Sequence, residues 1–245
     1  MDKELEEKLR YLRLTEILSC WDEIMAEAKK KSPSYTAWLK DLVSKEFSAK
    51  QERGRLLRLG RAKLEEPFLL ETYPFASQPA LNKKRIHEIF DSCSYLTKKQ
   101  NVIFIGPTGT GKTGLATALL IHAINKGMKG RFITFPDLLN ELYRSMADHS
   151  ENKVMAKFAA YDCLVIDELG YIEINPDKAG MFFTLMKRRH KKATTIITTQ
   201  LGFKEWTGFM KNPHLTSALV DRLHSNADVI NMSKCNSLRP SPSAK

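Results

Sequence analysis

Eight consecutive residues near the middle of the chain combine glycines with a lysine and a threonine. They read Gly-Pro-Thr-Gly-Thr-Gly-Lys-Thr from Gly106 to Thr113 and fit the pattern G-x-x-x-x-G-K-[ST] at every fixed position. Glycine lets the backbone wrap closely around phosphate, so that several N–H groups and a helix N-terminus point at the anion. We expect Lys112 to reach the β- and γ-phosphates of a nucleoside triphosphate and Thr113 to hold Mg²⁺. The residues expected to form this phosphate loop are Gly106, Pro107, Thr108, Gly109, Thr110, Gly111, Lys112, Thr113 and Gly114.

Two adjacent carboxylates follow an apolar run further along the chain. Asp167 and Glu168 come directly after Cys163-Leu164-Val165-Ile166, which has the composition of a buried strand. We expect Asp167 to bind Mg²⁺, directly or through water, and Glu168 to polarise the water that attacks the γ-phosphorus. A metal site alone needs only the first acid, so the pair favours hydrolysis over mere binding. The alternative is a pair of surface acids that end a strand.

Two polar residues later in the chain are further candidates for catalysis. Gln200 closes the run Thr194–Thr199, where an amide can hydrogen-bond the γ-phosphate or the attacking water. Arg222 lies in an amphipathic turn before the last apolar run, where an arginine can act in trans on the nucleotide of a neighbouring subunit. Alternatively, Arg222 forms an ion pair with Asp221 or Asp228, and the sequence alone leaves both readings open.

Basic residues gather in two places, and the chain carries a formal net charge of +11. A strongly basic chain favours a polyanionic partner such as nucleic acid. The alternatives are a solvated helix for the first cluster and, for the second, cations that favour a helix C-terminus. Nothing in either cluster resembles a base-reading motif, so we expect contacts with the DNA backbone irrespective of base sequence. The residues concerned are Arg53, Arg55, Arg58 and Arg61 in the first cluster, and Lys187, Arg188, Arg189, Lys191 and Lys192 in the second.

The segments that position these residues alternate between strand and helix from residue 101 onward. Apolar runs predict strands over 101–105, 131–135, 162–167, 194–199 and 228–232. Helix-forming segments are 115–124, 136–142 and 179–189. This alternation predicts a five-stranded parallel sheet in a three-layer α/β/α core.

The N-terminal part of the chain has a different character. Residues 1–66 read as almost wholly helical, with Trp38, Leu39, Leu42, Val43 and Phe47 as the apolar face of one helix. We expect an N-terminal helical domain over 1–66 that binds DNA or a partner, a linker and entry helix over 67–100, and an ATPase domain over 101–245. The four cysteines lie far apart and read as reduced thiols of a cytoplasmic protein. No apolar run approaches a signal sequence or a membrane span.

With these pieces placed, the chain resembles the IstB-like ATPases, the helper proteins of insertion-sequence transposases. This family is related to the DnaC and DnaI helicase loaders of the AAA+ superfamily. Beside the phosphate loop, three segments carry the resemblance. They are Ser34-Tyr35-Thr36-Ala37-Trp38-Leu39 near the N-terminus, Val165-Ile166-Asp167-Glu168-Leu169-Gly170, and Ala218-Leu219-Val220-Asp221-Arg222-Leu223-His224.

The resemblance implies an AAA+ P-loop NTPase fold without a C-terminal helical lid, and it implies a role for each candidate residue. Lys112 and Thr113 correspond to Walker A, and Asp167 and Glu168 to Walker B. Gln200 falls at sensor 1 and Arg222 at the arginine finger. Arg239 matches the closing Ser-x-Arg, which makes it a sensor 2 candidate. Three positions depart from the family: Gly114 replaces a common His, Gln200 a common Asn, and Cys235 a common Gly.

We therefore expect an ATPase that uses ATP and Mg²⁺, is stimulated by DNA, and self-associates into a ring or helical oligomer on double-stranded DNA. Its expected role is to regulate a transposase encoded alongside it. The alternative is a replicative helicase loader of the DnaC/DnaI type, which prefers single-stranded DNA. A nucleotide-binding adaptor that does not hydrolyse ATP is disfavoured, because binding alone does not need Glu168. A GTPase is disfavoured because no Asn-Lys-x-Asp motif is present.

Overall fold

The computed structural model describes residues 1–171, 174 and 176–239, and these divide into two units. Unit 1 comprises residues 1–57 and unit 2 the remainder from residue 58. The long helix α4 (Tyr35–Ala62) runs through this division. The functional domains expected over 1–66, 67–100 and 101–245 stay a prediction.

Unit 1 is built from short helices that pack on the first part of α4. They are α1 (Lys3–Tyr11), α2 (Thr15–Ser19) and α3 (Trp21–Lys31). The buried carboxylate of Glu46 on α4 accepts hydrogen bonds from the backbone N–H groups of Glu16 (2.9 Å) and Ile17 (3.1 Å). Those N–H groups belong to the first turn of α2, where no helical carbonyl is available to them. Glu46 thus caps α2 from a distant point in the sequence.

The apolar face expected on α4 is divided between two sides of the helix. Trp38 and Leu42 are half-buried. Leu39, Val43 and Phe47 are 55%, 57% and 59% exposed. Residues four apart share a helix face, so the exposed three form a stripe on the side away from α1–α3. The apolar spacing predicted from the sequence does not tell which part of this face is buried, because both stripes have the same spacing.

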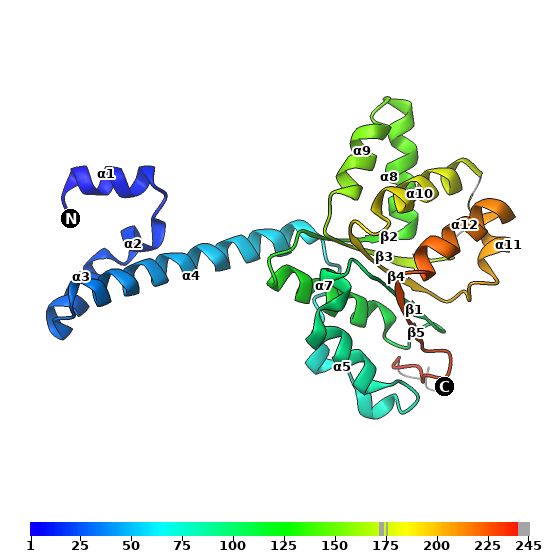
Figure 1. Cartoon of the computed structure of the whole chain (residues 1–245), viewed down its shortest axis with the longest axis horizontal. Helices are drawn as coiled ribbons and strands as arrows, with labels where there is room; N and C mark the ends of the chain where they lie inside the picture. Colours follow the sequence, from blue (N-terminus) through cyan, green and yellow to red (C-terminus); the bar gives the residue numbers. More distant parts are fainter. Residues whose placement is uncertain (172–173, 175, 240–245) are drawn as a thin grey trace, which may run out of the picture. The chain divides into compact units, whose positions relative to one another are not determined.

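Unit 2 contains a sheet of five parallel strands in the order β2-β3-β4-β1-β5 (Figure 1). The strands are β1 (Asn101–Ile105), β2 (Gly130–Thr134), β3 (Cys163–Leu169), β4 (Thr194–Thr199) and β5 (Ala227–Asn231). All five lie within a residue or two of the predicted positions. Because β1 lies between β4 and β5, the loop that follows β1 emerges beside the end of β4.

Helices cover both faces of the sheet, as the three-layer prediction requires (Figure 1). Alternate strand residues enter the two apolar cores: Val102 and Phe104 face one, Ile103 the other. The first core includes α5 (Lys83–Ser92), α6 (Ser94–Thr97) and α7 (Lys112–Asn125). The second includes α8 (Phe135–Ala147), α9 (Glu151–Ala159), α10 (Pro176–Arg189), α11 (Trp206–Met210) and α12 (Pro213–His224).

The segments around the sheet complete the fold. Between α4 and α5 the chain forms two single-turn 3₁₀ helices, η1 (Leu70–Thr72) and η2 (Phe75–Ser77). After β5, the described residues up to 239 contain no helix, in agreement with the expected lack of a lid. No helix within the described residues is long and apolar enough to cross a lipid bilayer.

Candidate nucleotide site

The phosphate loop connects the end of β1 to the start of α7, as the sequence predicts. Gly109 and Gly111 have φ values of +85° and +88°, which lie in the left-handed region. Residues with a Cβ rarely adopt this conformation. The two glycines therefore allow the chain to turn sharply before Lys112 begins the helix. The first N–H groups of α7 then face the cleft, where an anion is favoured.

Lys112 is buried inside the loop. Its Nζ donates to the carbonyl oxygens of Gly106 and Pro107, both at 2.8 Å. Burial lowers the pKa of Lys112, Arg239 lowers it further, and the carboxylates of Asp167 and Glu168 oppose the change. Two neutral carbonyls compensate an ammonium group poorly compared with phosphate oxygens. The surroundings of Lys112 therefore fit an anionic ligand.

Asp167 joins the loop to the neighbouring strands. It is only 3% exposed, and the Thr113 hydroxyl donates to its carboxylate at 3.1 Å. The Thr198 hydroxyl also donates to Asp167. Burial raises the pKa of Asp167, while the hydrogen bonds from Thr198 and Thr113 counteract the shift. A buried carboxylate beside a threonine hydroxyl is an oxygen donor set suited to Mg²⁺, so Thr113 and Asp167 fit the metal role predicted for them.

Glu168 has a different setting from its neighbour. Its φ is +60°, and the register between β3 and β4 shifts between Ile166 and Leu169. The Glu168 N–H donates to the Thr198 hydroxyl at 3.0 Å, and the side chain is exposed. A positive φ at a residue other than glycine costs about 1–3 kcal/mol, and backbone strain of this kind clusters at active sites. The bulge allows Asp167 to be buried and Glu168 to be exposed although they are adjacent.

Several carboxylates gather near this end of the sheet. Burial and the charges of Asp167, Glu168 and Asp137 raise the pKa of Glu65, which lies just after α4. The larger part of this shift comes from burial, and the neighbouring carboxylates add repulsion to it. A divalent cation would relieve the repulsion, which adds to the fit of Asp167 and Thr113 to Mg²⁺.

The phosphate loop and Glu168 border a cleft of about 240 Å³. The hydroxyl groups of Thr108, at the tip of the loop, and Tyr171, after β3, lie 3.1 Å apart across it. Arg239 also borders the cleft, and its role as sensor 2 stays a prediction. The residues that line it are Thr108, Gly109, Gly111, Lys112, Thr113, Glu168, Tyr171, Thr198, Leu238 and Arg239.

Gln200 and Arg222 are not among the lining residues. Gln200 is exposed, directly beyond the end of β4. The Arg222 guanidinium lies 4.9 Å from the centre of the Phe183 ring and donates to the Ala218 carbonyl at 2.8 Å. Neither acid considered as a partner is paired with Arg222 among the described residues; Asp228 pairs instead with Arg85. The catalytic roles of Gln200 and Arg222 stay predictions.

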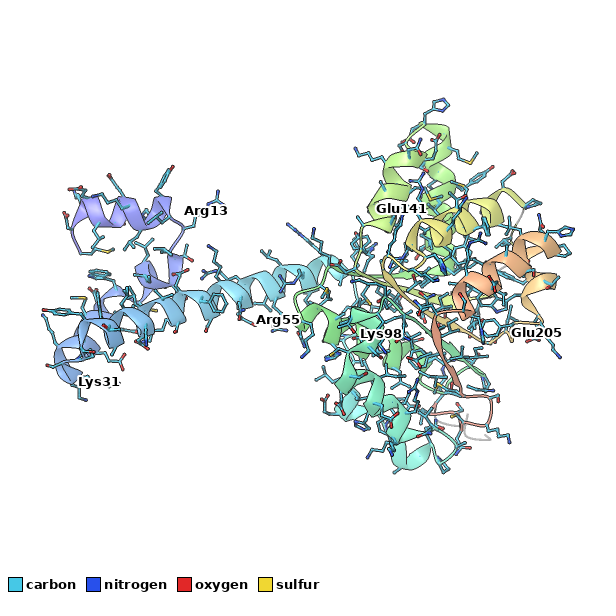
Figure 2. The ribbon with its side chains drawn as sticks, in the orientation of Figure 1. Arg13, Lys31, Arg55, Lys98, Glu141 and Glu205 are labelled. Atoms are coloured by element: carbon cyan, nitrogen blue, oxygen red, sulfur yellow. The ribbon has the colours of Figure 1, made fainter. Side chains whose placement is uncertain are left out.

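The arginine cluster on α4 is partly neutralised within its own helix. Arg53 pairs with the buried Glu46 at 2.9 Å, and Arg55, labelled in Figure 2, pairs with Glu52 at 2.6 Å. Arg58 and Arg61 form no ion pair with the described residues. Within this cluster, Arg58 and Arg61 are therefore the better candidates for phosphate contacts.

The second basic cluster lies where α10 ends and the turn into β4 begins, at the end of the sheet opposite the phosphate loop. Lys187, Arg188, Lys191 and Lys192 are exposed there. Arg189 is 1% exposed, so the prediction that it contacts DNA is wrong. A helix turn directs neighbouring side chains to different sides, and at this position the side chain points into the core.

The buried Arg189 is satisfied by neutral oxygen atoms. Its guanidinium donates to the carbonyl oxygens of Phe158 and Tyr161 at 2.8 Å and of Thr194 at 2.5 Å. It also donates to the Thr195 hydroxyl at 3.0 Å. Burial lowers the pKa of Arg189 to about 10. Arg189 therefore connects the end of α9 to β4, which is a structural role.

Several residues of the site were missed from the sequence. Thr198 was read only as part of a strand, although it lies next to the end of β4 and its hydroxyl donates to Asp167. Phe68 packs on Gly114, where a Cβ would lie 3.2 Å from the ring. Gly114, which has no side chain, thus leaves room for the Phe68 ring. Nothing in the linker composition indicated that Phe68 would reach the loop, because that contact depends on how the chain folds back.

Comparison with known proteins gives a consistent result across the chain. A family model described as "IstB-like ATP binding protein" matches residues 7–245. The candidate ATP-binding protein of insertion sequence IS5376 from Geobacillus stearothermophilus is 31% identical over 232 residues, covering 95% of this chain and 92% of that protein. The corresponding protein of insertion sequence IS21 from Pseudomonas aeruginosa is 29% identical, covering 94% of this chain and 86% of that protein.

Three solved structures share the fold. The DnaC helicase loader has a TM-score of 0.53 at 18% identity, covering 70% of this chain and 97% of that one. DnaI has a TM-score of 0.54 at 18% identity, covering 62% of this chain and 86% of that one. AMPPCP-bound DnaA from Aquifex aeolicus has a TM-score of 0.58 at 17% identity, covering 71% of this chain and 53% of that one. At these identities the similarity establishes the fold alone.

Proposed function

The chain belongs to the family of IstB-like ATP-binding proteins, and from this membership we propose that it is an ATPase that assembles on duplex DNA and regulates a transposase encoded alongside it. It has the AAA+ fold and binds ATP as the family does. Hydrolysis, the dependence on Mg²⁺ and DNA, and the transposase partner are the proposed part.

The observation that carries this proposal is the extent of the family match. It begins at residue 7 and so includes the helical unit 1 as well as the ATPase unit. Phosphate loops alone occur in many unrelated enzymes. Relatives from insertion sequences that match over both units support a role in transposition more directly than the phosphate loop does.

The side chains around the cleft support hydrolysis. Lys112 would exchange its two carbonyl partners for phosphate oxygens. Glu168, exposed beside the cleft, would accept a proton from a water that attacks the γ-phosphorus. Mg²⁺, held by Thr113 and Asp167, would neutralise charge on the phosphates. Thr198 fixes both acids, because its hydroxyl bonds the Asp167 carboxylate and the Glu168 backbone.

A direct test compares the parent protein with no DNA, with duplex DNA and with single-stranded DNA of equal nucleotide content. We expect ATP turnover and particle size, measured by phosphate release and light scattering, to increase most with the duplex. The increase should not depend on base sequence. Stimulation by single-stranded DNA alone would support the helicase-loader reading. A parent protein that binds ATP but does not hydrolyse it under any condition would refute the ATPase proposal.

A further inference from the structure

The last described segment of the chain runs along the phosphate loop, and we name residues 232–239 the C-terminal strap. The Met232 N–H donates to the Ile105 carbonyl at 2.6 Å, and the Leu238 N–H donates to the Gly109 carbonyl at 2.8 Å. Leu238 and Arg239 then line the nucleotide cleft. Within the strap a single turn is closed by the Cys235 N–H, which donates to the Met232 carbonyl at 3.0 Å, so the rest of its position depends on the few groups outside it that hold it.

Gln78 provides the central attachment of the strap. Its side-chain Nε2 donates to the Asn236 carbonyl at 2.6 Å, and its Oε1 accepts from the Asn236 N–H at 2.8 Å. The amide of Gln78 thus pairs with both backbone groups of one residue. Gln78 is 1% exposed, so water does not readily replace these bonds.

Gln78 is itself attached to the phosphate loop by its own segment. It follows η2, and the nearby Tyr73 hydroxyl donates to the Thr110 carbonyl at 2.8 Å. The Tyr73 ring also lies against Gly111, where a Cβ would approach it to 2.7 Å. The segment from Tyr73 to Gln78 and the strap therefore contact the same loop and each other.

We propose that Gln78 is a positioning residue for nucleotide binding, which acts by holding Leu238 and Arg239 in the cleft. The inference rests on the nucleotide site described above and extends it to a residue that does not contact the nucleotide. A lost Gln78 side chain leaves the Asn236 N–H and carbonyl without partners. The strap then gains conformational freedom that nucleotide binding must remove again, which weakens binding.

The test uses Gln78→Glu and Gln78→Leu in the full-length protein. At pH 8, the carboxylate introduced by Gln78→Glu cannot donate, and its charge faces the Asn236 carbonyl oxygen. We expect the Kd for ATP, measured by calorimetry, to rise about tenfold in both variants, which corresponds to about 1.4 kcal/mol. Amide hydrogen exchange of residues 232–239 without nucleotide should accelerate in both. Ser233→Glu, which adds the same charge at an exposed strap position, should match the parent protein.

Lowering the pH separates this role from general damage to the fold. Once protonated, the carboxyl group of the Gln78→Glu variant again has one donor and one acceptor and reproduces the pairing of glutamine. Because burial raises the pKa of a carboxyl group, we expect the ATP affinity of Gln78→Glu relative to the parent to recover between pH 8 and pH 6. Gln78→Leu has no such group and should show no recovery.

The outcomes separate the inference from the proposed function. Unchanged ATP affinity and unchanged strap exchange in both variants, with a parent that binds ATP, would overturn the inference and leave the proposed function intact. Equal losses at pH 8 and pH 6 in Gln78→Glu would also overturn it. Weakened binding that recovers at low pH would support the inference even if the parent did not hydrolyse ATP. A parent that does not bind ATP would refute both.

Discussion

Asp167 and Glu168 are adjacent in the sequence but lie in different surroundings. The first is buried and bonded to two threonine hydroxyls, and the second is exposed on a bulge. A metal ligand benefits from a fixed position, whereas a base must reach a water molecule. The Thr198 hydroxyl donates to the Asp167 carboxylate and accepts the backbone N–H of Glu168, while the Glu168 side chain stays exposed. A neutral residue therefore helps to position both acids.

The division of roles between Lys112 and Glu168 predicts different defects. Lys112→Ala should lose most ATP affinity, because the phosphate loop offers no other cation to the β- and γ-phosphates. Glu168→Gln should bind ATP and Mg²⁺ as the parent does but lose about 100-fold or more in turnover, the usual effect of losing a general base. Calorimetric ATP binding and phosphate release, measured on the same samples, separate the two defects. Parental turnover in Glu168→Gln would show that another group activates the water.

At the scale of elements, one side of α10 packs into the apolar core and the other side faces solvent. Arg189 points inward and bonds carbonyl groups of the α9–β3 connection and of β4. Lys187, two residues before, is exposed. A cluster of cations read from the sequence therefore contains residues with unrelated roles.

This contrast predicts a difference in stability. Arg189→Leu should lower the free energy of unfolding by about 3 kcal/mol or more, because several buried carbonyl groups lose their donors at once. The matched variant Lys187→Leu should change it by less than about 0.5 kcal/mol, as is usual for surface positions. Chemical denaturation followed by circular dichroism measures both. Equal stability of the two variants would contradict the structural role of Arg189.

DNA binding can be tested separately at each of the two basic clusters. Charge reversal of Arg58 and Arg61 on α4, or of Lys187, Arg188, Lys191 and Lys192 after α10, should weaken duplex binding at the cluster that contacts phosphates. Each lost contact should reduce the slope of log K against log salt by about 0.9. Fluorescence anisotropy over a salt series gives this slope. A cluster whose reversal changes neither affinity nor slope is excluded as a DNA surface.

At the scale of the whole molecule, the position of Arg222 bears on whether the protein self-associates. Arg222 packs on Phe183 and is not among the residues that line the cleft of its own chain. Charge that develops on the γ-phosphate is stabilised by an arginine in many nucleotide hydrolases, often from a neighbouring molecule. An arginine presented away from its own site is compatible with such a role only if the protein self-associates.

Mixing two inactive variants tests action in trans. Arg222→Ala should bind ATP nearly normally but lose about 10³-fold or more in turnover, and DNA should no longer stimulate it. A subunit with Arg222→Ala retains Glu168 and can receive Arg222 from a Glu168→Gln neighbour. We therefore expect turnover to reappear when the two variants are mixed on duplex DNA.

One result of the mixing experiment would contradict the action of Arg222 in trans. If co-assembly on DNA is shown by crosslinking of differently labelled subunits and the mixture stays as inactive as its parts, Arg222 acts within its own subunit or only in folding. Normal turnover of Arg222→Ala alone would exclude a finger role altogether.

The sequence by itself determined the parts of this protein whose signal is local. The phosphate loop, the acid pair and the five apolar strands each occupy a short continuous stretch, and the composition of that stretch specifies the structure. No single short stretch specifies the order of the strands in the sheet. The rule that helices connect parallel strands through right-handed crossovers nevertheless leaves few possible orders. The nucleotide site at the ends of β1 and β3 could therefore be predicted.

Only the tertiary structure decided which side chains meet across long distances in the sequence. Gln78 pairs with Asn236, Phe68 covers Gly114, and Thr198 bonds Asp167. The composition of these segments is that of ordinary linkers and strands, so no local pattern indicates the contacts. The same limit applies to Arg189 and the exposed stripe of α4, because a helical sequence gives the spacing of its faces but not which face another segment covers.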